Sequence, residues 1–74
     1  MFEAQIKITL KKTVADPQGL IIKHALESLG FGGIGNVRVG KFLTIQVEDK
    51  SKVNEMCEKL LANPIIEDYT VEIK

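Results

Sequence analysis

The chain has 74 residues, and its 10 basic and 10 acidic side chains cancel to a formal net charge of zero. This length favours one domain over residues 1–74, with a core so small that association with other chains is expected. The charge balance argues against nucleic acid or an anionic membrane as a partner, and the single cysteine excludes an internal disulfide. No apolar run suits a bilayer span and no signal peptide is recognisable, so we expect a cytoplasmic protein.

The first predicted element is a strand over residues 2–11, where apolar and polar side chains alternate. Asp16 and Pro17 then form a typical helix start, with the aspartate as N-cap and the proline at the first helical position. The helix that follows carries an apolar stripe at helical spacing, which consists of Ile21, Ile22, Ala25, Leu26 and Leu29. Gly30 is a natural residue to end this helix, because glycine adopts the left-handed conformation without strain.

The middle of the chain poses a question of strand register. A glycine-rich loop leads to Val37 and Val39, and apolar alternation resumes at residues 43–47. A two-residue turn at Gly40–Lys41 would put these two apolar sets on opposite faces of a sheet. A three-residue loop at residues 40–42 keeps both sets on one face, and so does a strand that runs straight through. A straight strand would carry the second half of the chain away from the first, so that it would have to pack on another copy in a segment-swapped dimer. The sequence leaves both alternatives open.

The second half of the chain predicts another helix and a final strand. Ser51 can cap a helix whose apolar stripe consists of Val53, Met56, Cys57, Leu60 and Leu61. Asn63 and Pro64 end that helix, because proline cannot continue the helical hydrogen bonds and restricts the residue before it. A strand with a period of two follows from about Ile65 to Ile73. The element order β-α-β-β-α-β predicts an α+β fold, a ferredoxin-like antiparallel sheet with two helices on one face.

Residues with catalytic or ligand-binding potential are few, and structural roles explain each of them better. Residues 30–35 spell G-x-G-x-x-G, but a helix precedes them and a strand follows, the reverse of a dinucleotide site. Cys57 lies in an apolar stripe, where a free cysteine packs as a small hydrophobe, and His24 lies off the stripe of its helix. Glu67 and Asp68 point to opposite faces of a strand and cannot act as a carboxylate pair. We therefore predict no catalytic, cofactor-binding or metal-binding residue in this chain.

Several short motifs together resemble the PurS family, the small subunits of phosphoribosylformylglycinamidine synthase. They are Asp16–Gly19 at the start of the first helix, Val37–Lys41, Cys57 with Leu60–Pro64, and Ile66–Val71. Their order and spacing cover nearly the whole chain, although the glycine-rich loop is not part of the pattern. The resemblance implies an assembly subunit of a glutamine-dependent ligase in purine biosynthesis, without catalytic groups of its own.

The resemblance also implies partners, and roles for particular residues. ATP and magnesium are expected on a synthetase subunit, and a glutaminase subunit is expected to release the ammonia that the synthetase uses. The chain itself is expected to form a homodimer or higher oligomer that bridges these two subunits. Arg38, Lys41 and Glu67 are the candidate subunit contacts. Backbone geometry is the expected role of a second group, which consists of Asp16, Pro17, Gly19, Gly40, Asn63 and Pro64.

Two other functions fit the same element order. A small-molecule-sensing domain of the ACT-like type would bind an amino acid at a dimer interface, and a ligand-dependent rise in thermal stability would reveal it. An RNA-binding sheet would need aromatic residues on its central strands and a basic face. The chain has no tryptophan and no net charge, which argues against the RNA-binding alternative.

Overall fold

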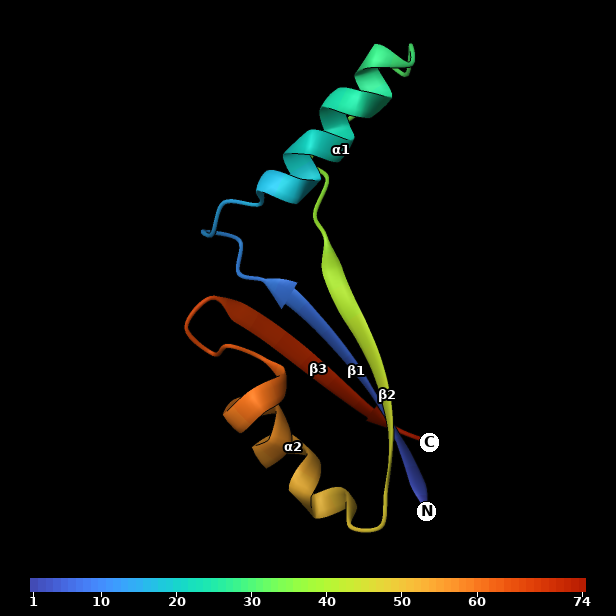
Figure 1. The fold of residues 1–74 in the computed structure, drawn as a ribbon, viewed down its shortest axis with the longest axis vertical. Helices are drawn as coiled ribbons and strands as arrows, with labels where there is room; N and C mark the ends of the chain where they lie inside the picture. Colours follow the sequence, from blue (N-terminus) through green and yellow to red (C-terminus); the bar gives the residue numbers. More distant parts are fainter.

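The computed structural model describes residues 1–74 as three strands and two helical regions (Figure 1). In chain order the elements are β1 (Phe2–Leu10), α1 (Pro17–Ser28), β2 (Gly40–Val47), η1 (Lys50–Lys52), α2 (Val53–Met56), η2 (Cys57–Leu61) and β3 (Glu67–Ile73). The segment η1 is a 3₁₀ turn, and η2 continues α2 as a π-helical turn. None of the helices has the length and apolar character of a membrane span. The predicted α+β class is confirmed.

β1 is the central strand of an antiparallel sheet with the strand order β2-β1-β3. Ile6 on β1 lies opposite Leu43 on β2 and Val71 on β3, so this register gathers apolar side chains on one face. The second helical region covers that face of the sheet (Figure 1). The core that forms between them consists of Ala4, Ile6, Ile8, Val47, Val53, Cys57 and Ala62.

This core is small even for so short a chain. Only 8 of the 74 residues are buried, and many large apolar side chains remain exposed. The radius of gyration of the Cα atoms is 15.6 Å, against roughly 11 Å for a compact chain of this length. The molecule measures 48 × 24 × 14 Å, because part of the chain extends beyond the sheet.

The extended part is an arm formed by residues 11–39, with α1 at its centre (Figure 1). Asp16 caps α1 as predicted, since its Oδ1 accepts a 2.9 Å hydrogen bond from the Gly19 N–H. Gly30 follows the end of the helix with a φ of 96°. The sequence predicts that both helices cover one face of the sheet. Within one chain, however, only the second helical region covers that face. The apolar stripe of α1 is therefore largely exposed, with Ile21 at 68% and Leu29 at 74%.

The register question in the middle of the chain is decided against a turn at Gly40. Gly40 lies opposite Thr9 in the sheet, and only Gly30 and Gly33 have positive φ angles. A Cβ atom at Gly40 would lie 2.7 Å from the carbonyl oxygen of Ile8, so close approach to β1 explains this glycine. The hairpin alternative is wrong, and the chain passes from the arm into β2 without reversing. Residues 37–39 also do not form the separate strand that the sequence predicts.

Two details of the second helical region differ from the prediction. Asp49, not Ser51, provides the cap, because its Oδ1 accepts hydrogen bonds from the Ser51 N–H (3.0 Å) and hydroxyl (2.6 Å). The hydroxyl of Ser51 donates to Asp49, and no side chain caps the start of α2. The helix widens into the π-helical turn η2, and Leu60 lies in solvent at 83% exposure instead of in the core. Cys57 is fully buried, as predicted.

The predicted corner at Asn63 and Pro64 is confirmed, with Asn63 as its organising residue. The side-chain Oδ1 of Asn63 accepts a 3.1 Å hydrogen bond from the Ile65 N–H. Its carbonyl oxygen accepts hydrogen bonds from the N–H groups of Ile66 and Glu67. Ile65 consequently lies in the turn at 81% exposure, and β3 begins at Glu67 rather than at Ile65.

Candidate functional site

The first candidate surface is an apolar stripe on the exposed side of α1. Because successive helical residues are about 100° apart, its members project in similar directions. Exposure rises from 38% at Ile22 to 74% at Leu29. We call this surface the arm stripe; it consists of Ile21, Ile22, Ala25 and Leu29. Contiguous exposed apolar side chains of this kind indicate contact with another protein.

The second candidate surface is a groove beside α2, on the face of the sheet that carries the core. Its volume is about 600 Å³, and we call it the open groove. Its apolar lining is Ile45, Met56, Leu60 and Leu61, and its charged rim is Lys52, Glu55 and Lys59. In the predicted arrangement a second helix would lie beside the first on this face. The helix α1 of the same chain lies elsewhere, so this position is vacant within one chain (Figure 1).

The third feature joins the arm to the sheet; we call it the clasp, and it consists of Asp16, Gly19, Arg38 and Val39. Asp16 uses both carboxylate oxygens, because Oδ1 accepts the Gly19 N–H and Oδ2 accepts a 2.8 Å hydrogen bond from the Val39 N–H. Arg38 donates from Nη2 to the carbonyl oxygens of Lys11 (2.9 Å) and Val14 (3.0 Å). The Nε atom of Arg38 lies 4.0 Å from Oδ2 of Asp16, whose side chain is only 5% exposed.

Gly19 shows how closely α1 approaches the segment that leads back from the arm to β2. It is the one buried residue of α1, and a Cβ atom built on it would lie 2.0 Å from the carbonyl oxygen of Val37. No side chain fits at that distance, so this contact requires glycine. Pro17 stands at the first helical position, where its missing N–H costs no hydrogen bond.

Hydrogen bonding lowers the pKa of Asp16 below its ordinary value. The main cause is the N–H of Val39, followed by the N–H of Gly19, and the positive charge of Arg38 adds a smaller effect. A carboxyl group with a lowered pKa stabilises the folded state at pH values above its unfolded pKa of about 3.9. That contribution is lost as the pH falls through the lower, folded pKa.

The free energy of unfolding of the Asp16→Asn variant is expected to fall less steeply with decreasing pH than that of the unmodified chain. Asparagine has no charge to titrate, so the two proteins should differ most in their free energy of unfolding above about pH 4 and converge at lower pH. Urea denaturation at a series of pH values measures this difference. A difference that stays constant down to about pH 2 would contradict the assigned role of the Asp16 carboxylate.

The structure places the three candidate subunit contacts near the base of the arm, in different settings. Arg38 belongs to the clasp, so its guanidinium is already bound within the chain. Glu67 accepts a 2.7 Å hydrogen bond from the Asn63 N–H and closes the turn before β3. Lys41 makes no ion pair in the chain, and it lines a cavity of about 360 Å³ together with Asp16 and Glu67. Lys41 is therefore the candidate whose charge remains available to a partner.

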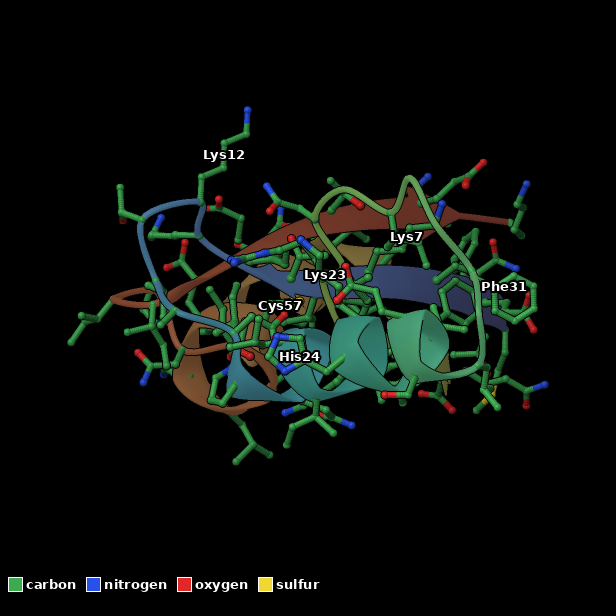
Figure 2. All side chains as sticks on the ribbon, turned by 90° about the horizontal axis from the view of Figure 1, so that it is seen from above. Lys7, Lys12, Lys23, His24, Phe31 and Cys57 are labelled. Atoms are coloured by element: carbon green, nitrogen blue, oxygen red, sulfur yellow. The ribbon has the colours of Figure 1, made fainter.

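The side chains that could take part in catalysis or metal binding do not form a cluster. Burial, followed by the negative charge of Glu58, raises the pKa of the Cys57 thiol, whereas an activated nucleophile needs a lowered pKa. His24 is exposed on α1, a different element from Cys57 (Figure 2). No group of three or more His, Cys, Asp or Glu side chains is placed to hold a metal ion. The arm stripe and the open groove, by contrast, are apolar surfaces of the kind that contact other proteins.

Sequence reasoning did not find the two features that shape this site. Val39 acts through its backbone N–H, which no pattern of residue types reports. Met56 and Leu60 are predicted to be buried, yet they line the open groove at 38% and 83% exposure. The apolar stripe predicted for residues 53–61 is wide, and this width is the one signal that could have indicated two separate contact surfaces on the second helical region.

A small α+β fold with exposed apolar surfaces on its arm and beside α2 is typical of a protein-interaction module. The chain belongs to the PurS family, because the sequence model described as "PurS: Phosphoribosylformylglycinamidine (FGAM) synthase" matches residues 3–74. The FGAM synthase subunit PurS of Bacillus subtilis is 40% identical over 79 residues, which covers 100% of this chain and 94% of the relative. The subunit of Methanocaldococcus jannaschii is 41% identical over 80 residues, covering 100% of this chain and 96% of the relative.

Solved structures agree with this family assignment. The structure of Bacillus subtilis PurS has a TM-score of 0.93 at 40% identity and covers 100% of this chain and 99% of that chain. A chain in the structure of PurLQS from Thermotoga maritima has a TM-score of 0.76 at 31% identity, covering 99% of this chain and 96% of that chain. The family predicted from the motifs is thus confirmed, and its members are subunits of FGAM synthase, a ligase complex of purine biosynthesis.

Proposed function

We propose that the chain is a non-catalytic, cytoplasmic assembly subunit that holds the synthetase and glutaminase subunits of FGAM synthase together. The observation that carries this proposal is the likeness of nearly the whole chain to a chain of the PurLQS structure from Thermotoga maritima. The unpartnered surfaces agree with it, as does the placement of His24 and Cys57 on different helical elements, α1 and η2. ATP and magnesium would bind the synthetase subunit, and the chain would carry no cofactor.

The benefit of such a subunit is proximity. Ammonia released by the glutaminase would escape or become protonated if it had to diffuse through water to the synthetase. Holding the two active sites in one complex raises the effective concentration of ammonia at the synthetase. The chain would therefore contribute to the reaction by positioning its partners.

A homodimer with exchanged arms completes this proposal. Each arm stripe would enter the open groove of the other copy, and each sheet would gain the second helix that it lacks. The lengths are compatible: the 12 residues of α1 span about 18 Å, and a helix over residues 52–61 spans about 15 Å. Both surfaces are apolar, and burying them together would add apolar contacts to the small core of the single chain.

Reconstitution of the ligase from purified subunits tests this function. FGAM formation is measured with glutamine or with free ammonia as the nitrogen donor, with and without this chain. Omitting the chain should lower glutamine-dependent synthesis by about tenfold or more, while synthesis from saturating ammonia should be little changed. Equal glutamine-dependent rates with and without the chain would contradict the proposed function.

Arg38, Lys41 and Glu67 remain the proposed subunit contacts, and Lys41→Ala is the variant that tests one of them cleanly. Because Lys41 makes no ion pair within the chain, its loss should leave the melting temperature unchanged. Affinity for the partner subunits should fall by roughly 2- to 5-fold, the effect of an exposed charge pair. Arg38→Ala would also open the clasp and so mix two effects.

Lys12 provides the matched control for this experiment, because it is another exposed lysine without an ion pair and it points away from the ribbon (Figure 2). Titration of the partner subunits with each variant, followed by fluorescence anisotropy, measures both affinities. Equal affinities of Lys41→Ala, Lys12→Ala and the unmodified chain would remove Lys41 from the interface.

A further inference from the structure

We propose that Asp16 is the positioning residue that fixes the direction of the arm and so commits the arm stripe to the open groove of a second copy. The inference rests on the proposed exchange of arms and identifies what enforces it. The arm stripe and the open groove of one chain could bury each other's apolar side chains, yet α1 lies apart from α2 (Figure 1).

The arm is attached to the sheet by two passes of the chain, residues 11–16 outward and residues 32–39 on the return. No backbone–backbone hydrogen bond outside the helices and strands involves residues 32–39. The sheet holds the returning chain only from Gly40 onward, because Gly40 is the first residue of β2 and pairs with Thr9 of β1. The direction of the return pass must therefore be set by side chains.

Asp16 provides the central tie between these passes. It stands at the end of the outward pass, and its Oδ2 accepts the N–H of Val39, the residue directly before β2. Its Oδ1 accepts the N–H of Gly19 in the first turn of α1. One carboxylate thus fixes the start of α1 against the start of β2, and α1 can leave the sheet in only one direction.

Arg38 provides a second tie in the same place. Its guanidinium reaches from the return pass to two carbonyl oxygens of the outward pass, those of Lys11 and Val14. Gly19 allows the contact, because α1 lies directly against the carbonyl of Val37. To place α1 in its own open groove, the chain would have to reverse between the arm and β2, which would break the hydrogen bond from Val39 to Asp16.

The Asp16→Asn variant distinguishes the N-cap role of Asp16 from its hydrogen bond with Val39. The single side-chain oxygen of asparagine can accept the N–H of Gly19 or that of Val39, but not both, and its amide is a donor that repels the other N–H. Asparagine is as good an N-cap as aspartate, so α1 should still form. Asp49→Asn is the matched control, because Oδ1 of Asp49 alone accepts both groups of Ser51.

The experiment measures the dimer dissociation constant by sedimentation equilibrium and the rate of subunit exchange between tagged and untagged dimers. Asp16→Asn should weaken the dimer by roughly 10- to 100-fold, the loss expected for a hydrogen bond to a charged group, and should speed exchange. Helix content by circular dichroism should be unchanged, and Asp49→Asn should alter neither dimer property. Arg38→Lys, which keeps the charge but not the paired carbonyl contacts, should weaken the dimer in the same direction if Asp16→Asn fails to fold.

The outcomes separate this inference from the function on which it rests. A dimeric unmodified chain whose dissociation constant is unchanged by both Asp16→Asn and Arg38→Lys would overturn the positioning role alone. An unmodified chain that stays monomeric at all concentrations would overturn arm exchange and this inference together. The assembly role of the chain is measured independently by the reconstituted ligase.

Discussion

Ile6→Ala is expected to cost about 2–5 kcal/mol of the free energy of unfolding, the usual range for a large aliphatic residue removed from a core. Ile6 is fully buried in the central strand and lies opposite Leu43 and Val71 on both neighbouring strands. A core of seven residues has few neighbours that can move in to fill the cavity. Since small domains lie at the low end of protein stability, this single change should leave much of the protein unfolded.

Urea denaturation at one fixed chain concentration measures this loss, because the stability of an oligomer depends on concentration. Lys7→Ala is the control, since Lys7 is the next residue of the same strand and is exposed on the other face of the sheet. It should change stability by less than about 0.5 kcal/mol. Equal effects of the two changes would show that the face assigned to the core is wrong.

Ile21→Glu is expected to abolish the dimer at micromolar concentrations while leaving the single chain folded. Ile21 is 68% exposed in the arm stripe, so a charge there costs nothing in one chain. In the proposed dimer the same charge would be buried in the open groove without a partner, which costs several kcal/mol. That corresponds to a weakening of roughly 1,000-fold or more.

Leu20→Glu is the matched control for this second change. Leu20 is also exposed, at 53%, but it lies about 100° from Ile21 around α1 and outside the arm stripe. Light scattering coupled to size-exclusion chromatography should find a monomer for Ile21→Glu and a dimer for Leu20→Glu. A dimer that survives Ile21→Glu would contradict the assignment of the arm stripe to the dimer interface.

Much of the fold can be predicted from the sequence, because the signals are local. The alternation around Ile6, the cap and proline at Asp16–Pro17 and the break at Asn63–Pro64 each follow from the conformational preferences of a few neighbouring residues. Cys57 could be placed in the core because its neighbours at helical spacing are apolar. These elements owe little to distant parts of the chain.

The direction of the arm could not be predicted, because it depends on contacts between distant residues. Apolar phase alone allowed either a loop or a straight passage at Gly40, and the close approach of Gly40 to Ile8 is visible only in three dimensions. The hydrogen bond from Val39 to Asp16 joins residues 23 positions apart. Residue spacing likewise does not indicate the π-helical turn at Cys57–Leu61, or that Leu60 within it is exposed in the open groove.

The candidate contacts illustrate the same limit. Arg38 and Lys41 are both basic residues beside Gly40, and the sequence treats them alike. The structure separates them, since Arg38 is bound to carbonyl oxygens of the arm whereas Lys41 is free of ion pairs. Which charge is available to a partner therefore depends on the backbone path, not on residue type.

Sedimentation velocity of the synthetase and glutaminase subunits, with and without this chain, is the most direct test of its proposed role as an assembly subunit. We predict that the two large subunits sediment together only when the dimeric chain is present, and separately when it is absent or carries Ile21→Glu. Sedimentation of the synthetase and glutaminase as one complex without this chain would contradict that role.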